Sequence, residues 1–195
     1  MTNSNFHTKD NYSVYIKPNS IIKSYNVLNN CIIDGAEINS SNITNSKIGK
    51  NASVLYSYLF GSNVESGAKI GVFSHLREGS NIGENVRIGN FVETKKSDIK
   101  NGSKVSHLTY VGDAEIGENV NVGCGTVFCN YNGKIKQKTI VGNNVFIGSN
   151  SNLVAPLVVE DNSFIAAGST ITQKVPSKCL AIARARQVNK ENYLK

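Results

Sequence analysis

The segment VGNNVFIGSNSNLVAPLVVEDNSFIAAGSTI, residues 141–171, decides the fold. Every sixth residue of this segment is β-branched or leucine: Val141, Ile147, Leu153, Val159, Ile165 and Ile171. A helix repeats its apolar face every 3.6 residues and a half-buried strand every second residue, so neither explains a period of six. A period of six is typical of a chain that turns a corner after each short strand and points one aliphatic side chain inward on each side.

The same spacing runs through the middle of the chain, at Ile70, Leu76, Ile82 and Ile88 and again at Ile99, Val105 and Val111. Glycine often follows directly, as expected at corners where a Cβ would be crowded. Three such sides make a triangular coil, and stacked coils make a parallel β-helix. We therefore predict an all-β fold in which each coil buries its inner face only against its neighbours.

The period changes at three places, which predict the organisation of the chain. Ile33, Ile38, Ile43 and Ile48 step by five, so we expect less regular early coils. Residues 129–139 are polar and basic and contain an Asn-Gly turn signal, so we expect a loop ejected from the coil. The repeat ends after Pro176. The expected parts are a polar N-terminal arm (1–13), the hexapeptide-repeat domain (14–175) and a basic tail (176–195), the last a short helix or an extended arm.

Composition limits the classes of function. The chain has 195 residues, enough for one substantial domain, and its net charge is +7. The basic residues are spread along the whole chain, so a site for small anions explains this charge as well as nucleic acid does. The N-terminus has no apolar signal segment, and no apolar run approaches the ~20 residues that span a bilayer. The four cysteines have neither metal-site nor disulfide-scaffold spacing, which indicates free thiols in the cytoplasm.

Several polar motifs interrupt the scaffold in a fixed order. The most informative is Ser106-His107-Leu108-Thr109-Tyr110, because it places a histidine among residues that otherwise only build coils. The others are LREG (76–79), GNFVETKKS (89–97), GDAEIG (112–117), CNYNG (129–133) and AIAR (181–184).

In this order, the motifs resemble the acetyltransferase half of the bifunctional glucosamine-1-phosphate acetyltransferase/N-acetylglucosamine-1-phosphate uridyltransferase family. The resemblance is dense from Ile70 to Arg184 and rests on the repeat alone in the earlier coils. It implies a left-handed β-helix, a cytoplasmic homotrimer and acetylation of glucosamine 1-phosphate by acetyl-CoA without a metal, a step toward UDP-N-acetylglucosamine and the cell wall. The glycine-rich uridyltransferase half has no counterpart in this sequence, so we expect no formation of UDP-N-acetylglucosamine from UTP.

The resemblance also implies the roles of individual residues. His107 matches the general base, which takes a proton from the amine of glucosamine 1-phosphate; an imidazole with a reference pKa of ~6.5 suits that task. Either Glu115 or a backbone carbonyl is expected to orient the ring. Arg77 and Lys95 match residues that hold the sugar phosphate.

Further substrate contacts by resemblance are Tyr110, Asn121 and, in the ejected loop, Lys136. The residues that match acetyl-CoA contacts are Cys124, Asn130, Tyr131, Ser149, Ala167 and Arg184. Two of these motifs depart from the family: Cys124 stands where it has alanine, and Asn132 where it has aspartate. An acyl-enzyme on Cys124 is not expected, because direct attack on the thioester needs no covalent step.

The sequence leaves two other functions open. The alternatives are an acetyltransferase for another amino sugar and a non-catalytic trimeric scaffold, although a scaffold has no need of His107, Arg77 and Lys95 together. A γ-type carbonic anhydrase needs three zinc-binding histidines, and only His75 and His107 lie in the repeat. No recognised RNA-binding module or membrane segment is present in the sequence, so neither partner is expected.

Overall fold

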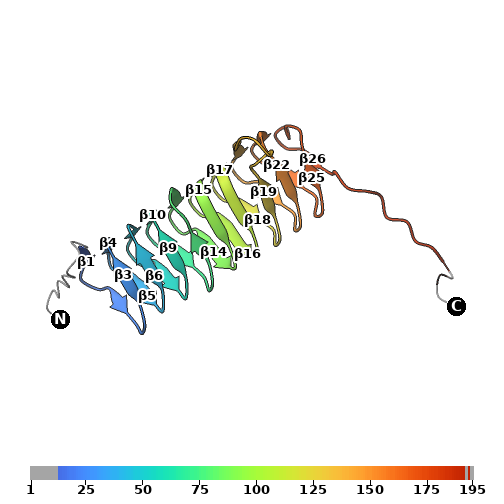
Figure 1. Cartoon of the computed structure of the whole chain (residues 1–195). Helices are drawn as coiled ribbons and strands as arrows, with labels where there is room; N and C mark the ends of the chain where they lie inside the picture. Colours follow the sequence, from blue (N-terminus) through green and yellow to red (C-terminus); the bar gives the residue numbers. More distant parts are fainter. Residues whose placement is uncertain (1–12, 192, 194–195) are drawn as a thin grey trace.

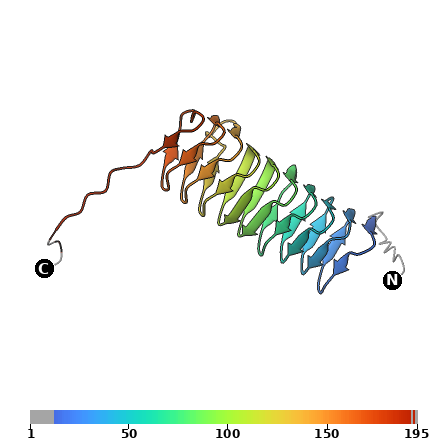
Figure 2. The same cartoon turned by 180° about the vertical axis from the view of Figure 1, so that it is seen from behind.

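A computed structural model describes residues 13–191 and residue 193, and within them the chain forms 26 short strands and no helix. The strands pair in parallel and stack into one straight rod, with β1 at one end and β26 at the other (Figures 1 and 2). The predicted parallel β-helix is confirmed. The expected N-terminal arm lies, apart from Ser13, outside the described residues.

Each coil has three sides, so the rod has three faces. Face 1 holds β1 (Val14–Ile16), β4 (Cys31–Ile33), β7 (Lys47–Ile48), β10 (Ser62–Val64), β13 (Ser80–Ile82), β20 (Thr139–Val141) and β23 (Leu157–Val159). Face 2 holds β2 (Ile21–Ile22), β5 (Glu37–Asn39), β8 (Ser53–Leu55), β11 (Lys69–Ile70), β14 (Arg87–Asn90), β16 (Lys104–His107), β18 (Asn121–Val122), β21 (Phe146–Ile147), β24 (Phe164–Ile165) and β26 (Leu180–Ala181).

Face 3 holds β3 (Val27–Asn29), β6 (Asn42–Thr44), β9 (Tyr58–Phe60), β12 (His75–Leu76), β19 (Val127–Cys129), β22 (Asn152–Val154) and β25 (Thr170–Ile171). Two longer strands, β15 (Glu93–Ile99) and β17 (Tyr110–Ile116), begin on face 3 and end on face 1. They bend at Lys96 and Asp113, which have positive φ angles. These two strands join the faces where several candidate site residues lie.

The core is the inward row that the period of six predicts. All six residues from Val141 to Ile171 are buried, at 4% exposure or less, and so are the earlier members of the row. Thr94 takes the inward position between Ile88 and Ile99 and satisfies its hydroxyl by donating to Ser80 Oγ at 2.8 Å. The register of the coils therefore continues through this polar residue.

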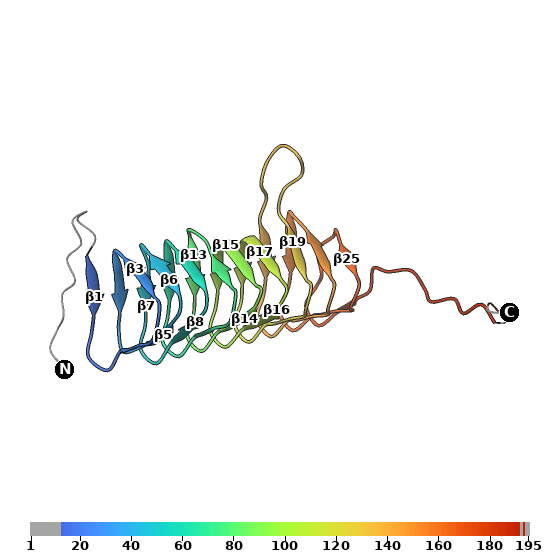
Figure 3. The same ribbon diagram turned by 60° about the horizontal axis from the view of Figure 1, so that its bottom comes forward.

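The irregular segments follow from the same geometry. In the early coils Ile33, Ile38, Ile43 and Ile48 are all buried, so a step of five simply makes a shorter side. The predicted loop leaves the coil between β19 and β20 and projects from the rod (Figure 3). The coil continues to β26, beyond the boundary expected at residue 175, and the chain then leads away as an extended segment (Figure 1).

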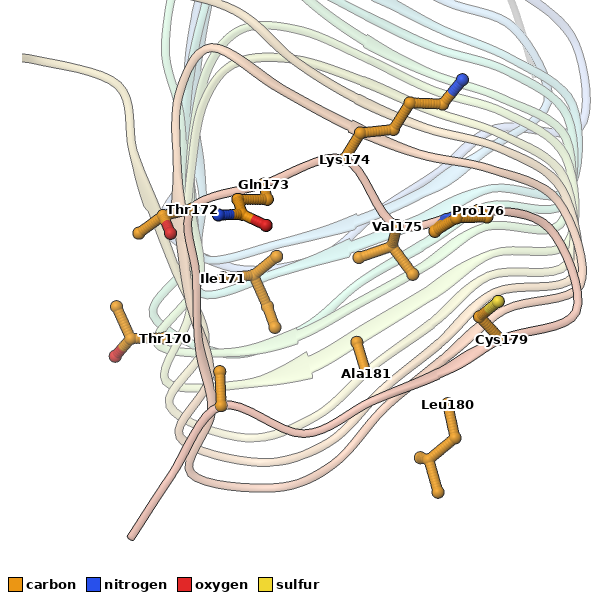
Figure 4. A pocket seen from close by; sticks show the side chains of 11 residues that line it. Thr170, Ile171, Thr172, Gln173, Lys174, Val175, Pro176, Cys179, Leu180 and Ala181 are labelled. Carbon is orange, nitrogen blue, oxygen red and sulfur yellow. The ribbon is translucent and has the colours of Figure 1, made fainter.

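The last coil ends in a hollow of about 380 Å³. Ile171, Val175 and Ala181 point into the interior of this coil, whereas Thr170 and Leu180 point outward (Figure 4). The hollow is therefore the open end of the core rather than a polar site. Among the described residues there is no helix long and apolar enough to cross a membrane.

The three corners of the coil differ in composition. Between faces 1 and 2, asparagine and glycine supply most of the left-handed conformations, as these residues do most readily. Between faces 2 and 3, five large side chains adopt φ between 46° and 58° and are exposed. We call these five the corner ridge: Tyr25, Tyr56, Phe73, Phe91 and Leu108.

Candidate functional site

Arg77 and Lys95 occupy equivalent positions on neighbouring coils of face 3. The Arg77 amide donates to the Thr94 carbonyl at 2.9 Å, and β12 pairs with β15 in continuous register. Neighbouring coils are one strand spacing apart, ~4.8 Å, so both cations project from the same face at short range. The two residues are eighteen positions apart in the sequence, which here is one full coil.

The ejected loop adds a third cation to this pair. The nearby Lys136 ammonium lowers the pKa of Lys95, with smaller contributions in the same direction from partial desolvation and from Arg77. Asp113 acts in the opposite direction. Arg77 in turn donates from its guanidinium to Glu93 Oε1 at 2.8 Å. We call Arg77, Lys95 and Lys136 the cation group. Its three positive charges outnumber the two nearby carboxylates, Glu93 and Asp113, so the surface is suited to an anion.

Tyr110 and Asn130 lie beside the cation group. Lys95 pairs with Gly112 on β17, and the space over Gly112 is filled by the Tyr110 hydroxyl and the Asn130 amide. The Asn130 amide donates to Asp113 and lies 3.4 Å from the Tyr110 hydroxyl. A Cβ at residue 112 would overlap both groups, so this glycine lets the polar network form.

Within the ejected loop, Tyr131 and Lys136 form an isolated antiparallel bridge. The Asn132 side-chain oxygen accepts from the amides of Lys134 and Ile135 at 3.0 and 2.9 Å. A carboxylate oxygen could accept the same two bonds, so the departure at residue 132 is compatible with the turn. Tyr131 is exposed, and its hydroxyl donates to the Gly133 carbonyl at 2.7 Å.

His107 lies at the end of β16, on face 2, one residue before the corner ridge. The next coils place Cys124, Ser149 and Ala167 at the same position. Backbone hydrogen bonds link these positions from coil to coil: the amide of Gly125 donates to the His107 carbonyl, that of Asn150 to the Cys124 carbonyl and that of Gly168 to the Ser149 carbonyl. We call these four residues the histidine row.

Arg184 lies one coil beyond the histidine row but past the corner, where it aligns with Thr170 of face 3, and its side chain lies near Gly168. Thr170 donates to the Ala183 carbonyl at 3.0 Å, which fixes the start of the tail beside the last coil. From His107 to Arg184 there are four coil spacings, about 19 Å. Asn121 is also on face 2, paired with Lys104 of the previous coil. Asn130 and Tyr131, which match acetyl-CoA contacts, lie instead with the cation group.

The group that orients His107 is not Glu115. Glu115 lies on the part of β17 that belongs to face 1, where its carboxylate pairs with Lys138. Among the described residues the imidazole has no side-chain hydrogen bond, whereas its backbone carbonyl accepts from the Thr109 hydroxyl at 2.7 Å. The single chain therefore holds His107 by its backbone.

The sequence assigns no role to two residues that lie in the site, Glu93 and Asp113. Glu93 is two residues before Lys95, and outward strand positions alternate, so its presence on the same surface could have been inferred. Asp113 contacts Asn130 only because the coil ejects residues 130–138 at that level. No sequence pattern around Asp113 predicts its contact with Asn130.

The four cysteines differ in environment. Cys31 is buried, and desolvation raises the pKa of its thiol to about 11. Burial also raises the pKa of Cys129. Cys124 is half-buried in the histidine row, and Cys179 is exposed. The raised pKa values of Cys31 and Cys129 are the opposite of what a nucleophilic thiol usually needs.

Known proteins resemble the chain in sequence. The bacterial transferase hexapeptide family (six repeats) matches residues 138–173. A bifunctional protein GlmU from Shouchella clausii is 54% identical over 180 residues, which cover 91% of this chain and 38% of that protein. The GlmU from Clostridium acetobutylicum is 59% identical over 155 residues, covering 80% and 34%. The chain thus spans little more than a third of the length of these curated relatives.

A solved structure supports the fold independently. The UDP-N-acetylglucosamine acyltransferase of Francisella novicida aligns with a TM-score of 0.64 at 14% identity, covering 86% of this chain and 66% of that one. At that identity the likeness concerns the fold alone. The chain is a homologue of the GlmU proteins that carries the bacterial transferase hexapeptide repeat and has the left-handed parallel β-helix of their acetyltransferase half.

Proposed function

We propose that the chain transfers an acetyl group from acetyl-CoA to the amine of glucosamine 1-phosphate. The observation that carries this proposal is the cation group on face 3, the face that adjoins the histidine row at the corner ridge. Arg77, Lys95 and Lys136 provide a phosphate site on face 3, and His107 is three residues from Tyr110 of that site. Homology to GlmU over most of the chain points to the same substrate class.

The chemistry assigned to His107 is proton acceptance. The neutral amine attacks the thioester carbonyl, the imidazole takes the amine proton, and the tetrahedral intermediate collapses to the amide and the coenzyme A thiolate. The proton on His107 then neutralises the thiolate, so the base is regenerated. The proposed step needs no acyl-enzyme and no metal.

The histidine row offers a track for acetyl-CoA. Its side chains after His107 are small, and together with Arg184 it extends about 19 Å along the rod. A long, thin acyl carrier fits such a track, with its thioester at His107 and a phosphate at Arg184. Gly123 and Gly148 directly precede Cys124 and Ser149 of this track. Both positions require glycine, because a Cβ at either one would clash with the backbone of the next coil.

We further propose that the working form is a cytoplasmic homotrimer with sites between subunits. In one chain the histidine row and the cation group lie on different faces and both are open to solvent. The corner ridge lies between these faces and exposes five large side chains, which is a feature of protein contact surfaces. A cyclic trimer would cover the ridge and enclose the site.

A thiol-release assay with acetyl-CoA and a panel of amino sugars tests the proposed activity. Glucosamine 1-phosphate should be the preferred acceptor, with release dependent on both substrates. If another amino sugar is preferred, that sugar is the acceptor in place of glucosamine 1-phosphate. If no acceptor gives thiol release, a non-catalytic scaffold is favoured. Light scattering tests the trimer, and a monomer mass at working concentration would contradict it.

A further inference from the structure

A hollow of about 510 Å³ opens on face 3 and extends from Arg77 and Lys95 of the cation group to the preceding coil. Tyr58 and Phe60 of β9 form its wall at one end, and Arg77, Lys95 and Lys96 line the other end. The proposed transfer reaction uses Arg77 and Lys95 but gives no task to the aromatic half. Tyr58 and Phe60 are therefore free to contact a part of a ligand other than its phosphate.

The aromatic and cationic ends follow from the register of the coils. Leu59 pairs with Leu76, and Leu76 with Thr94, so the next residues Phe60, Arg77 and Lys95 stand in one outward column. In the preceding outward column, Tyr58 meets His75 edge to face, with ring centroids 5.1 Å apart. Two strand spacings, about 10 Å, separate the aromatic coil from Lys95.

The aromatic rings are open on one side. Tyr58 is 44% exposed and Phe60 is 37% exposed, so each ring offers surface to a ligand. Exposed aromatic rings beside cations are the arrangement by which proteins stack a base and hold its phosphate.

Charge at the hollow favours an anion at one end only. Arg77 and Lys95 lie at the cationic end, and the Lys96 side chain packs over Gly79. Glu78 also lines the hollow, and its Cβ and Cγ pack over Gly61, at the level of the aromatic coil. A ligand with its phosphate near Lys95 and an uncharged ring near Phe60 satisfies both ends.

We propose that this hollow binds a nucleoside phosphate, with the base against Tyr58 and Phe60 and the phosphate at Arg77 and Lys95. The proposal rests on the phosphate-binding role that the proposed function gives to those two cations. It extends the acceptor class from a sugar phosphate to an amino sugar linked through phosphate to a nucleoside. A sugar phosphate alone would leave the aromatic end empty.

Titration of the 195-residue chain with uridine 5′-monophosphate, adenosine 5′-monophosphate and ribose 5-phosphate tests the proposal. Both nucleotides should bind at least about tenfold more tightly than ribose 5-phosphate, because stacking tolerates either base. Phe60→Ala and Tyr58→Ala should each remove most of this difference without weakening ribose 5-phosphate. Phe164→Ala, which removes an exposed aromatic ring on face 2, should leave all three affinities unchanged.

The outcomes separate the two proposals. Equal affinities for the nucleotides and ribose 5-phosphate would overturn the nucleoside site, and so would a difference that survives both aromatic substitutions. If the chain still acetylates glucosamine 1-phosphate in that case, the proposed function stands without the extension. If Arg77→Ala changes neither the binding of any phosphate nor acetyl transfer, the phosphate role of the cation group fails and both proposals lose their basis.

Discussion

Faces 2 and 3 are built on the same inward row but differ in what they present to solvent. On face 2 the histidine row places one imidazole and then three small side chains at one position of successive coils. On face 3 the equivalent columns carry aromatic rings and then cations. The aliphatic core therefore determines where an outward side chain stands, and the outward residue alone determines what it can do. The chemistry proposed for this chain requires both faces, which meet at the corner ridge.

Removing the imidazole tests face 2 and should have the largest effect. A general base contributes roughly 10²–10⁴-fold in rate, so His107→Ala should lower kcat by that factor with little change in KM. Asn90→Ala, which changes the residue paired with His107 on the previous coil, is the matched control. Steady-state kinetics with glucosamine 1-phosphate measures both. A His107→Ala variant that keeps most of its kcat would remove His107 from the mechanism.

A core substitution tests what the two faces share. Leu76 is fully buried between His75 and Arg77, so Leu76→Ala should lower the free energy of unfolding by about 2–5 kcal/mol. Val158→Ala, at an exposed position of face 1, should change it by less than about 0.5 kcal/mol. Denaturant unfolding provides the comparison. Equal effects would mean that the inward row does not carry the stability of the coil.

Lys95→Ala tests face 3 and should have a smaller effect on activity. Its ammonium lacks the two-pronged donor geometry of a guanidinium, and the adjacent Lys136 can take over part of its role. We expect kcat/KM for glucosamine 1-phosphate to fall severalfold but less than for Arg77→Ala. A larger loss in Lys95→Ala than in Arg77→Ala would reverse the roles assigned to the two cations.

The corner ridge should show the smallest effect on the single chain. Phe73 has φ of 58° and stacks on Phe91 with ring centroids 5.5 Å apart. Asparagine adopts this conformation more readily, so Phe73→Asn should cost the isolated coil no more than about 1 kcal/mol. The same substitution should weaken subunit association, seen by light scattering on dilution. Tyr15→Asn, on β1, is the control, and equal association of both variants would place the contact surface elsewhere.

The scaffold could be predicted because its signal is local. An inward side chain recurs every five or six residues, and the Asn132-Gly133 turn marks the ejected loop. Contacts between coils could not be predicted in the same way. Glu93 pairs with Arg77 from one coil away, and Asn130 reaches Asp113 only through the loop.

Two expectations show the limit of motif matching. Glu115 is near His107 in sequence, but the bend at Asp113 carries it to face 1, where it pairs with Lys138. The corner ridge could not be predicted from the sequence either, because large apolar residues rarely adopt the left-handed conformation that its five residues have. Both results depend on how the coil turns, which residue type alone does not reveal.

The phosphate site is tested most directly by comparing glucosamine 1-phosphate with glucosamine as acceptors, in the native chain and in Arg77→Ala. A hydrogen bond to a charged group is worth roughly 1.5–3 kcal/mol. Arg77→Ala should lower kcat/KM for glucosamine 1-phosphate at least about tenfold and affect glucosamine far less, because glucosamine has no phosphate to hold. An equal loss on both acceptors would contradict the phosphate site and point to a different amino sugar held by other groups.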